Sequence, residues 1–150
     1  YQQSISFFRL ADSICAAMPI GLGLVRIGNF INGELYGRTT DGTWGFVFPT
    51  DPYGFTRHPS QLYEAFLEGL ILFIVLMVIG AKNKKPGVIS GSFLIGYGLI
   101  RFFIEYFRQP DAHMGFIALQ LSMGQLLSIP MVIIGLILLL KSLKKNEAIS

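Results

Sequence analysis

The chain alternates long apolar runs with shorter polar segments. Four runs approach the roughly 20 residues that an α-helix needs to cross the hydrocarbon core of a bilayer, which is about 30 Å thick. They lie at residues 14–32, 62–81, 89–107 and 118–140. The second and fourth are almost uninterrupted, whereas the first and third are rich in glycine and contain arginine. The pattern predicts an all-α membrane protein in which about four transmembrane helices form a single transmembrane domain over residues 1–150.

The positions of the lysines predict the orientation of these helices. Every lysine lies either between the second and third runs or after the fourth, namely Lys82, Lys84, Lys85, Lys141, Lys144 and Lys145. Both places are on one side if all four helices cross, and the positive-inside rule makes that side cytoplasmic. We therefore expect both termini of this segment in the cytoplasm. The loops at residues 33–61 and 108–117 are then on the outer side.

The outer loop at residues 33–61 contains turn signals. Asp41-Gly42 lies between two threonine-containing segments, residues 38–40 and 43–45, and is typical of a small β-hairpin. The loop is also aromatic, with Trp44, Phe46, Phe48, Tyr53 and Phe55. These rings would suit the lipid headgroup layer or would pack on one another within the loop.

Composition narrows the possible functions. Only 14% of the residues are charged, against about a quarter in soluble domains. No basic patch interleaved with aromatic residues lies outside the apolar runs, so we expect no nucleic-acid partner. The single cysteine, Cys15, excludes an intrachain disulfide and a cysteine-rich metal site. His58 and His113 lack metal-ligand spacing, so we predict no metal, and we expect no cofactor.

The polar residues of the apolar runs share one depth. Given the predicted orientation, they lie in the outer half of each run: Arg26, Asn29, Glu64, Glu68, Arg101, Glu105, Ser122 and Gln125. An ionisable group at the centre of a bilayer costs about 2.5–3.5 kcal/mol, so each needs a physical reason. The inner halves contain no charge. An ion pathway would place polar groups along the whole depth, which makes a transporter or channel subunit the weaker interpretation.

Helical spacing groups some of these residues. Arg101, Glu105 and Arg108 follow an i, i+4, i+7 stripe, so Arg101 and Glu105 can pair within one helix. That pair either neutralises itself for insertion or orients Arg101 toward a ligand. Arg26 and Asn29 also share a face, where they could bind a ligand or join two helices.

Glycines and acids near these groups have structural explanations too. Gly21, Gly23 and Gly28 would allow close helix approach. Glu64 and Glu68 follow Pro59 at the start of the second run, where acids stabilise the positive end of a helix dipole. Glu68 lies deeper, so we expect it to have a cationic partner.

Arginines from two helices at one depth suggest a phosphate ligand. Arginine forms bidentate, charge-assisted hydrogen bonds to phosphate and stays protonated when partly desolvated. Arg26 and Arg101 together would suit the phosphodiester of a lipid headgroup. The sequence therefore predicts a site for an anionic lipid near the outer face of the bilayer.

Four segments resemble motifs of one known family, the prolipoprotein diacylglyceryl transferases. They are Gly23–Gly37, Arg57–Glu64, Gly96–Asp111 (with Tyr97, Gly98, Arg101, Glu105, Arg108, Gln109 and Pro110), and Ser122–Gln125 followed by Ser128 and Pro130. The resemblance runs in order over nearly the whole chain, which is more specific than any one motif.

The resemblance implies an enzyme of the bacterial plasma (inner) membrane. Its substrates would be phosphatidylglycerol and the signal-peptide lipobox of a prolipoprotein, whose cysteine thiol would receive the diacylglyceryl group as a thioether while glycerol phosphate leaves. We accordingly predict as catalytic residues Arg26, Asn29, Glu34, Arg101 and Glu105. The predicted substrate-binding residues are Arg26, Asn32, Gly37, His58, Gln61, Glu64, Arg101 and Arg108.

The chain also departs from the family pattern. It contains no His-Gly-Gly segment, which in the family carries a histidine of the site. It also starts without a methionine or a signal peptide. We therefore interpret it as the C-terminal portion of a longer enzyme. A noncatalytic membrane scaffold is the alternative that the missing segment leaves open.

Overall fold

The computed structural model describes residues 6–109, 116–118 and 121–144 of the chain. Its helices are α1 (Phe7–Asn32), α2 (Ser60–Glu64), the π-helix η1 (Ala65–Ile71), α3 (Leu72–Lys82), α4 (Val88–Ile104) and α5 (Met123–Lys144). Its strands are β1 (Phe46–Val47), β2 (Thr56–Arg57), β3 (Phe116–Ala118) and β4 (Leu121–Ser122). The protein is therefore mainly helical, as predicted.

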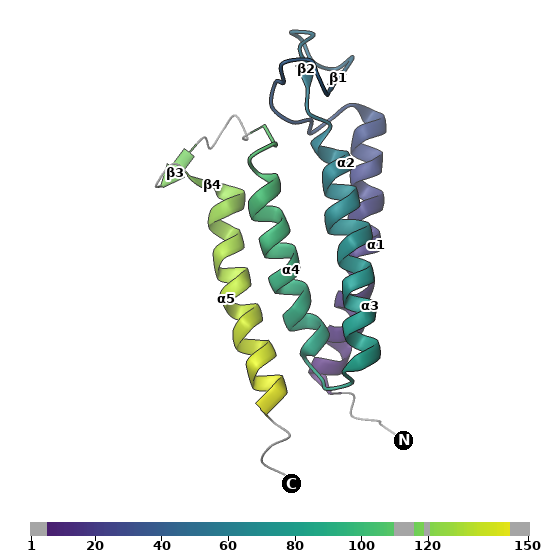
Figure 1. Ribbon diagram of the computed structural model, residues 1–150, viewed down its shortest axis with the longest axis vertical. Helices are drawn as coiled ribbons and strands as arrows, with labels where there is room; N and C mark the ends of the chain where they lie inside the picture. Colours follow the sequence, from purple (N-terminus) through teal and green to yellow (C-terminus); the bar gives the residue numbers. More distant parts are fainter. Residues whose placement is uncertain (1–5, 110–115, 119–120, 145–150) are drawn as a thin grey trace.

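The long helices form an elongated bundle (Figure 1). α2, η1 and α3 continue one another and pack against α1, while α4 packs against α1, α3 and α5. Strands β1 and β2 lie at one end, and the connection between α3 and α4 lies at the other, near the start of α1 (Figure 1). The bundle thus has a loop end, which carries β1 and β2, and a lysine end, which carries the α3–α4 connection.

Length and composition agree with about four membrane helices. Phe7–Asn32, Ser60–Lys82 and Met123–Lys144 are each long and apolar enough to cross a bilayer, and Val88–Ile104 is a shorter apolar helix. Many of their large apolar side chains face outward, for example Ile133, Ile137 and Leu140 on α5. Such a surface suits lipid as its solvent.

Several predicted boundaries were wrong. The first helix begins at Phe7 and not at residue 14, the third ends at Ile104 and not at 107, and the last begins at Met123 and not at 118. Hydropathy alone does not locate helix ends, which depend on local backbone and side-chain hydrogen bonds. The predicted loop at 108–117 and the start of the 118–140 run include residues 110–115 and 119–120, which lie outside the described residues, as do Pro110, Asp111 and His113.

The end of α1 agrees with the prediction and has a local cause. Gly33 adopts a left-handed conformation with φ of 67°. The amides of Gly33 and Glu34 donate to the carbonyl oxygens of Phe30 and Asn29, which is the Schellman pattern. This cap turns the chain sharply at the loop end of the bundle.

The start of α5 is capped by its own side chains. The Ser122 amide donates to Gln125 Oε1 at 3.1 Å, and the Gln125 amide donates to Ser122 Oγ at 3.3 Å. This reciprocal pair is a capping box, which satisfies amides that the first turn of a helix leaves open. It explains why the helix begins at Met123 although the apolar run starts earlier.

The start of α4 is capped from another helix. Asp12 on α1 is buried, and its carboxylate accepts hydrogen bonds from the Gly87 amide at 2.7 Å, the Ser90 amide at 2.8 Å and Ser90 Oγ at 2.8 Å. The expectation that the inner halves hold no charge was therefore wrong at this end. Asp12 was missed because α1 begins before the apolar run that predicted it.

Close helix approach occurs at only one of the three glycines predicted to allow it. A Cβ on Gly69 of η1 would lie 2.8 Å from Gly23 Cα on α1, so neither position has room for a side chain. By contrast, a Cβ on Gly21 or on Gly28 would have no atom within 4 Å. The α1–η1 crossing therefore rests on the Gly23–Gly69 contact.

The outer loop forms a hairpin, but with a different pairing from the one predicted. β1 pairs antiparallel with β2, Phe46 opposite Arg57, and Thr39 forms a bridge to the other edge of Arg57. Asp41-Gly42 makes a turn, with the Asp41 carboxylate accepting from the Thr43 amide and hydroxyl. On one side of that turn Thr39 bridges β2, and on the other side β1, which begins at Phe46, pairs with β2. The predicted pairing of residues 38–40 with residues 43–45 is therefore replaced by pairing with β2.

Candidate active site

A single buried carboxylate organises the polar cluster near the loop end. Glu64, the last residue of α2, is fully buried. Its Oε2 lies 2.8 Å from Arg26 Nε on α1, 3.1 Å from Arg101 Nη1 on α4 and 3.8 Å from Arg108 Nη1 just beyond α4. Three guanidiniums from separate parts of the chain therefore converge on one oxygen. We call Arg26, Glu64, Arg101, Glu105 and Arg108 the arginine cluster.

Glu105 provides the second carboxylate of this cluster. Its Oε2 lies 3.3 Å from Arg101 Nη2, so the ion pair predicted from helical spacing is present. A Cβ on Gly124 would lie 2.5 Å from Glu105 Oε2, so the carboxylate lies against the first turn of α5. The positive end of that helix dipole stabilises a negative charge there. Arg101 is thus held by one carboxylate from its own helix and one from α2.

The three guanidiniums are largely desolvated but still accessible. Their side chains retain 14% (Arg26), 15% (Arg101) and 11% (Arg108) of their exposed area. Glu64 Oε1 is buried without a hydrogen-bond partner among the described residues, and the contact of Arg26 Nε with Glu64 Oε2 is an ion pair without hydrogen-bond geometry. Among the described residues, the ion pair of Arg26 uses Nε only. The two terminal nitrogens of its guanidinium can therefore still bind a ligand oxygen.

Glu68 does not have the cationic partner that we expected. It is fully buried on η1, and both carboxylate oxygens lack a hydrogen-bond partner among the described residues. The arginines meet Glu64 instead, one helical turn nearer the loop end. A buried polar group without a partner is costly, so Glu68 is the least satisfied group near the cluster.

Four predicted site residues lie in the last turn of α1 or just after it, and none of them forms an ion pair with Glu64 among the described residues. The side chains of Asn32 and Glu34 are exposed and lie within 3.4 Å of each other. Asn29 is half-buried, and its carbonyl oxygen accepts in the α1 cap. A Cβ on Gly37 would lie 2.5 Å from the Phe107 carbonyl oxygen and 2.7 Å from that of His58. Gly37 therefore lets three backbone segments meet.

The remaining two predicted residues join the outer loop to α2. Gln61 is buried, and its Nε2 donates to the Glu34 carbonyl oxygen at 2.7 Å. His58 Nδ1 lies 3.3 Å from the Tyr63 hydroxyl, which accepts from Trp44 Nε1 at 2.8 Å. Within the described ranges, no three His, Cys, Asp or Glu side chains gather in a metal-binding arrangement.

An ion pair that sequence reasoning missed stabilises the outer loop. Arg57 Nε and Nη2 donate to the two oxygens of Asp51 at 2.7 and 3.1 Å, and the guanidinium lies 4.7 Å from the centre of the Tyr36 ring. The hydrogen bond from Arg57 holds the pKa of the Asp51 carboxyl below its ordinary value. The pKa of Arg57 is raised by the same bond.

The loop also fixes the end of α4. Gly37 forms an antiparallel bridge to Arg108, and Arg38 Nε donates to the Arg108 carbonyl oxygen at 2.9 Å. The Arg38 amide donates to the Phe107 carbonyl oxygen. The outer loop therefore positions the backbone from which the Arg108 guanidinium reaches Glu64.

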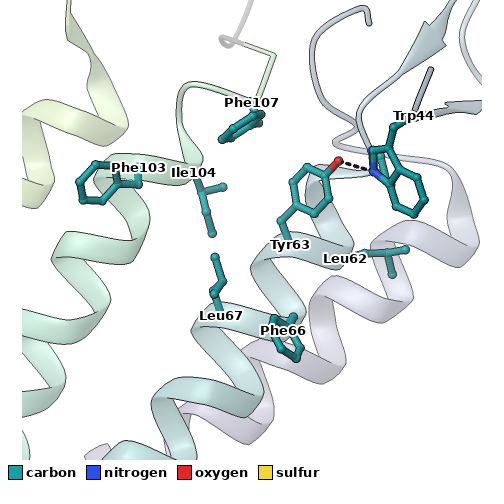
Figure 2. Close-up of a pocket in the computed structure, with 9 residues that line it drawn as sticks. Trp44, Leu62, Tyr63, Phe66, Leu67, Phe103, Ile104 and Phe107 are labelled. Atoms are coloured by element: carbon teal, nitrogen blue, oxygen red, sulfur yellow. Dashed lines mark hydrogen bonds between the residues drawn. The ribbon is translucent and has the colours of Figure 1, made fainter. Parts of the chain in front are cut away.

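An apolar groove lies on the same two helices as the cluster. It has a volume of about 450 Å³ and lies between the α2–η1 segment and the end of α4, with Trp44 from the outer loop at its rim (Figure 2). Its other lining residues are Pro59, Leu62, Tyr63, Phe66, Leu67, Phe103, Ile104 and Phe107. Tyr63 and Ile104 line the groove, and the next residue in the chain after each, Glu64 and Glu105, belongs to the cluster. The groove and the cluster are therefore formed by neighbouring residues of the same segments.

Comparison with known proteins decides the family. The profile of the prolipoprotein diacylglyceryl transferases matches residues 1–141. The chain belongs to this family. It is 56% identical, over 90% of its length, to the phosphatidylglycerol–prolipoprotein diacylglyceryl transferase of Geobacter sulfurreducens. It is 55% identical, over 93% of its length, to that of Photobacterium profundum, and 52% identical, over 97%, to that of Aliivibrio fischeri.

The chain spans about half the length of these curated relatives, since the aligned part covers 52% of each. The resemblance read from the four motifs is thereby confirmed at the level of the family. The roles of individual residues in this chain remain predictions. The cluster gathers Arg26, Glu64, Arg101, Glu105 and Arg108, whereas Asn32 ends α1 and Glu34, Gly37 and His58 belong to the adjoining loop.

Proposed function

We propose that the complete protein containing this chain transfers the diacylglyceryl group of phosphatidylglycerol to the cysteine thiol of a prolipoprotein lipobox. The observation that carries the proposal is the convergence of three arginines on buried Glu64 within an apolar bundle. Family membership names the reaction, and the cluster supplies the chemistry that such a reaction needs. We further propose that the cluster faces the outer leaflet and that the lysine end is cytoplasmic.

The arginines suit a phosphodiester by charge and by geometry. Three guanidiniums face two ion-paired carboxylates, Glu64 and Glu105, which leaves one positive charge in excess. Guanidiniums bind phosphate oxygens in a bidentate manner and remain charged when partly buried. Glu64 and Glu105 would hold Arg26 and Arg101 in place before the lipid arrives, which reduces the reorganisation that binding requires.

The apolar groove gives the rest of the lipid a place to lie. Its lining is free of charged side chains and includes Phe66, Phe103 and Phe107. An acyl chain or the glycerol backbone in this groove would place the phosphate near the arginines that Glu64 and Glu105 hold. Amphipathic ligands bind best where an apolar cleft adjoins a few polar groups.

The reaction needs little more from these residues than charge stabilisation. The thiol sulfur attacks the carbon of the diacylated glycerol that is joined to the phosphate oxygen. A C–S bond forms, and the bond between that carbon and the phosphate oxygen breaks. The electron pair leaves with glycerol phosphate, whose added negative charge the arginines would stabilise. The thiol proton, from a group of pKa near 8.5 in water, goes to a base or to solvent. Because Glu64 and Glu105 are paired with arginine, they are better suited to position the guanidiniums than to act as the base that takes the thiol proton.

A transporter or channel subunit is less well supported. Between Glu68, one turn below the arginine cluster, and Asp12 at the lysine end, the hydrophobic core that the structure describes centres on Leu72, Leu76 and Phe93. The carboxylate of Asp12 is occupied by three hydrogen bonds. The described residues thus offer no continuous polar path along the bundle.

The test incubates the complete protein with phosphatidylglycerol and a lipobox peptide, followed by mass spectrometry of the peptide cysteine. We expect a mass increase of one diacylglyceryl group, and no product from the intact enzyme would overturn the proposal. Arg26→Ala and Arg101→Ala should each lower kcat/KM by about a hundredfold, the scale of losing one preorganised donor to a developing anion.

The matched control removes a cation that is distant from the cluster. Lys141→Ala lies on the last turn of α5 and should leave turnover unchanged. Circular dichroism melts of all variants separate lost chemistry from lost folding. Undiminished turnover in a folded Arg101→Ala protein would reject the site while leaving the family assignment intact.

A further inference from the structure

A second groove lies at the lysine end of the bundle, opposite the arginine cluster. It has a volume of about 610 Å³ and lies between the start of α1, the end of α3 and the α3–α4 connection. Arg9 comes from α1, whereas Lys84 and Lys85 come from the connection. None of these residues belongs to the proposed transferase site. We call this cavity the basic groove.

The charges of the basic groove favour an anion. Three cations line it, and Asp12 is the single carboxylate. The Asp12 carboxylate already accepts three hydrogen bonds at the start of α4, so it is less able to pair with the lysines in place of a bound anion. Among the described residues, neither Arg9 nor Lys84 forms an ion pair. Lys85 Nζ donates to the Leu143 carbonyl oxygen at 3.1 Å, which holds its ammonium beside α5.

The floor of the groove is apolar. Met77 and Gly80 of α3 and Ile89 of α4 line it. Met77 and the neighbouring Val78 are exposed on the surface that faces lipid in a membrane helix. A ligand with both a negative charge and an apolar part could contact the cations and the apolar residues of the groove at once. A free anion could contact only the cations.

We propose that the basic groove binds the headgroup of an anionic phospholipid of the leaflet at the lysine end, with its phosphate between Arg9 and Lys84 and its glycerol and acyl carbons along Met77 and Ile89. Basic pockets between membrane helices on the cytoplasmic side commonly recognise such headgroups. The bound lipid would join α1 to the α3–α4 connection, next to the Asp12 cap. This site is separate from the proposed substrate site.

The test uses photoreactive phospholipids in nanodiscs that hold the complete protein. One probe is a phosphatidylserine and the other a phosphatidylcholine with the same diazirine-bearing acyl chain, and labelled peptides are mapped by mass spectrometry. We expect the phosphatidylserine probe to label the segments around Met77 and Ile89 at least fivefold more than the phosphatidylcholine probe. Higher salt should reduce the difference, because the attraction is electrostatic.

Matched charge variants connect this labelling to the groove. Arg9→Gln with Lys84→Gln should reduce the phosphatidylserine labelling at least fivefold, since each basic residue near an anionic surface changes binding by roughly that factor. Lys82→Gln with Lys144→Gln removes the same charge at the same end but outside the groove lining, and should leave the labelling unchanged. Thermal melts verify that each protein is folded.

Three outcomes would overturn the proposal. Equal labelling by the two lipids would show an ordinary lipid-facing surface. An equal loss in both double variants would show a diffuse electrostatic attraction and no defined groove. Competition by soluble glycerol phosphate as strong as by phosphatidylserine vesicles would show a site for free anions. None of these results depends on transferase activity, so failure here is distinguishable from failure of the proposed function.

Discussion

At the scale of single residues, Glu64 and Glu68 show how much the environment of a carboxylate matters. Both are fully buried and lie one turn apart. Glu64 faces three guanidiniums, whereas both oxygens of Glu68 lack a partner among the described residues. Burial alone therefore does not say what either side chain contributes to stability.

The two carboxylates should respond differently to the same substitution. Glu64→Gln leaves Arg26 and Arg101 facing each other without their shared anion, and we expect a loss of about 3–5 kcal/mol, the usual cost of removing one member of a buried ion pair. Glu68→Gln removes a carboxylate that has no partner among the described residues, so we expect no comparable loss of stability. Denaturant titration in micelles, followed by circular dichroism, measures both. Equal losses would contradict the assignment of Glu64 as the shared partner.

The outer loop offers a pH-dependent test. The pKa of Asp51 is lowered in the folded protein by the hydrogen bond from Arg57, so its ion pair stabilises the fold above the ordinary carboxyl pKa of 3.8. That contribution is lost as the pH falls through the lower folded value. Asp51→Asn should therefore lower the melting temperature at pH 7, and the gap to the parent protein should close as the pH falls below 3.8. A gap that is constant with pH would argue against the ion pair.

Sequence reasoning at this scale succeeded where contacts are local. Arg101 and Glu105 were paired correctly because four residues along a helix fix their distance. Glu64 was predicted as a substrate-binding residue or as an acid at the start of a helix, but its role as the partner of Arg26 depends on how two helices are rotated about their axes, which periodicity does not determine. Asp51–Arg57 was missed because an irregular loop has no period from which to infer contacts.

At the scale of elements, the α1–η1 crossing is the contact on which the cluster depends. Arg26 lies less than one turn beyond Gly23 on α1, and Glu64 lies just before η1, which carries Gly69. The distance between Arg26 and Glu64 is therefore sensitive to the spacing of these two helices.

A single methyl group should disturb that crossing. Gly69→Ala would place Cβ 2.8 Å from Gly23 Cα, and the helices must move apart because the clashing atom is backbone. We expect a loss of about 1–3 kcal/mol and a loss of transferase activity beyond what the lower stability explains. Gly21→Ala adds the same methyl group where no atom lies within 4 Å, so it is the control. Similar behaviour of the two variants would contradict the crossing.

The cap that Asp12 provides can be tested in the same way. Asp12→Ala leaves the amides of Gly87 and Ser90 without their acceptor, and we expect a loss of about 1–2 kcal/mol, typical of losing a helix cap. Hydrogen exchange should increase at the first turn of α4 in particular. Ser13→Ala, which removes a hydroxyl bonded only to the Arg9 carbonyl oxygen of its own helix, should leave that turn protected.

Helix number was predictable, whereas several helix ends were not, namely the start of α1, the end of α4 and the start of α5. Long apolar runs identify membrane helices because lipid demands about 20 apolar residues. The ends depend on caps, such as Ser122 with Gln125 and the carboxylate of Asp12 on α4. When the capping side chain belongs to a different helix, the sequence of the capped segment does not show it.

At the scale of the whole molecule, the two ends of the bundle differ in charge and in structure. Strands β1 and β2 lie at the loop end, and the α3–α4 connection lies at the lysine end (Figure 1). The loop end also carries the arginine cluster and the apolar groove, and the lysine end carries the basic groove. The positive-inside rule predicts that the lysine end is cytoplasmic. The family assignment from four motifs was confirmed, while the orientation and the interpretation as a C-terminal portion stay predictions.

Cysteine accessibility tests the orientation. Cys15 and any other cysteine of the complete protein are first replaced by serine, and single cysteines are then introduced at Val47 and at Lys82. Val47 is exposed on β1 of the outer loop, so a cysteine there should react with an impermeant maleimide in intact cells. A cysteine at Lys82 should react only after the membrane is permeabilised. The reverse pattern would invert the predicted topology.

The shared carboxylate of Glu64 also has a consequence for biogenesis. During synthesis α1 leaves the ribosome before α2, so Arg26 enters the membrane before its partner Glu64 exists. Arg101 does not have this difficulty, because Glu105 on the same helix accompanies it. The insertion of α1 therefore carries an unpaired charge, with a cost of up to about 3 kcal/mol, until the next hairpin follows. We expect the insertion machinery to retain α1 until α2 arrives, so that the site proposed for lipid chemistry would also set the order in which its helices are released.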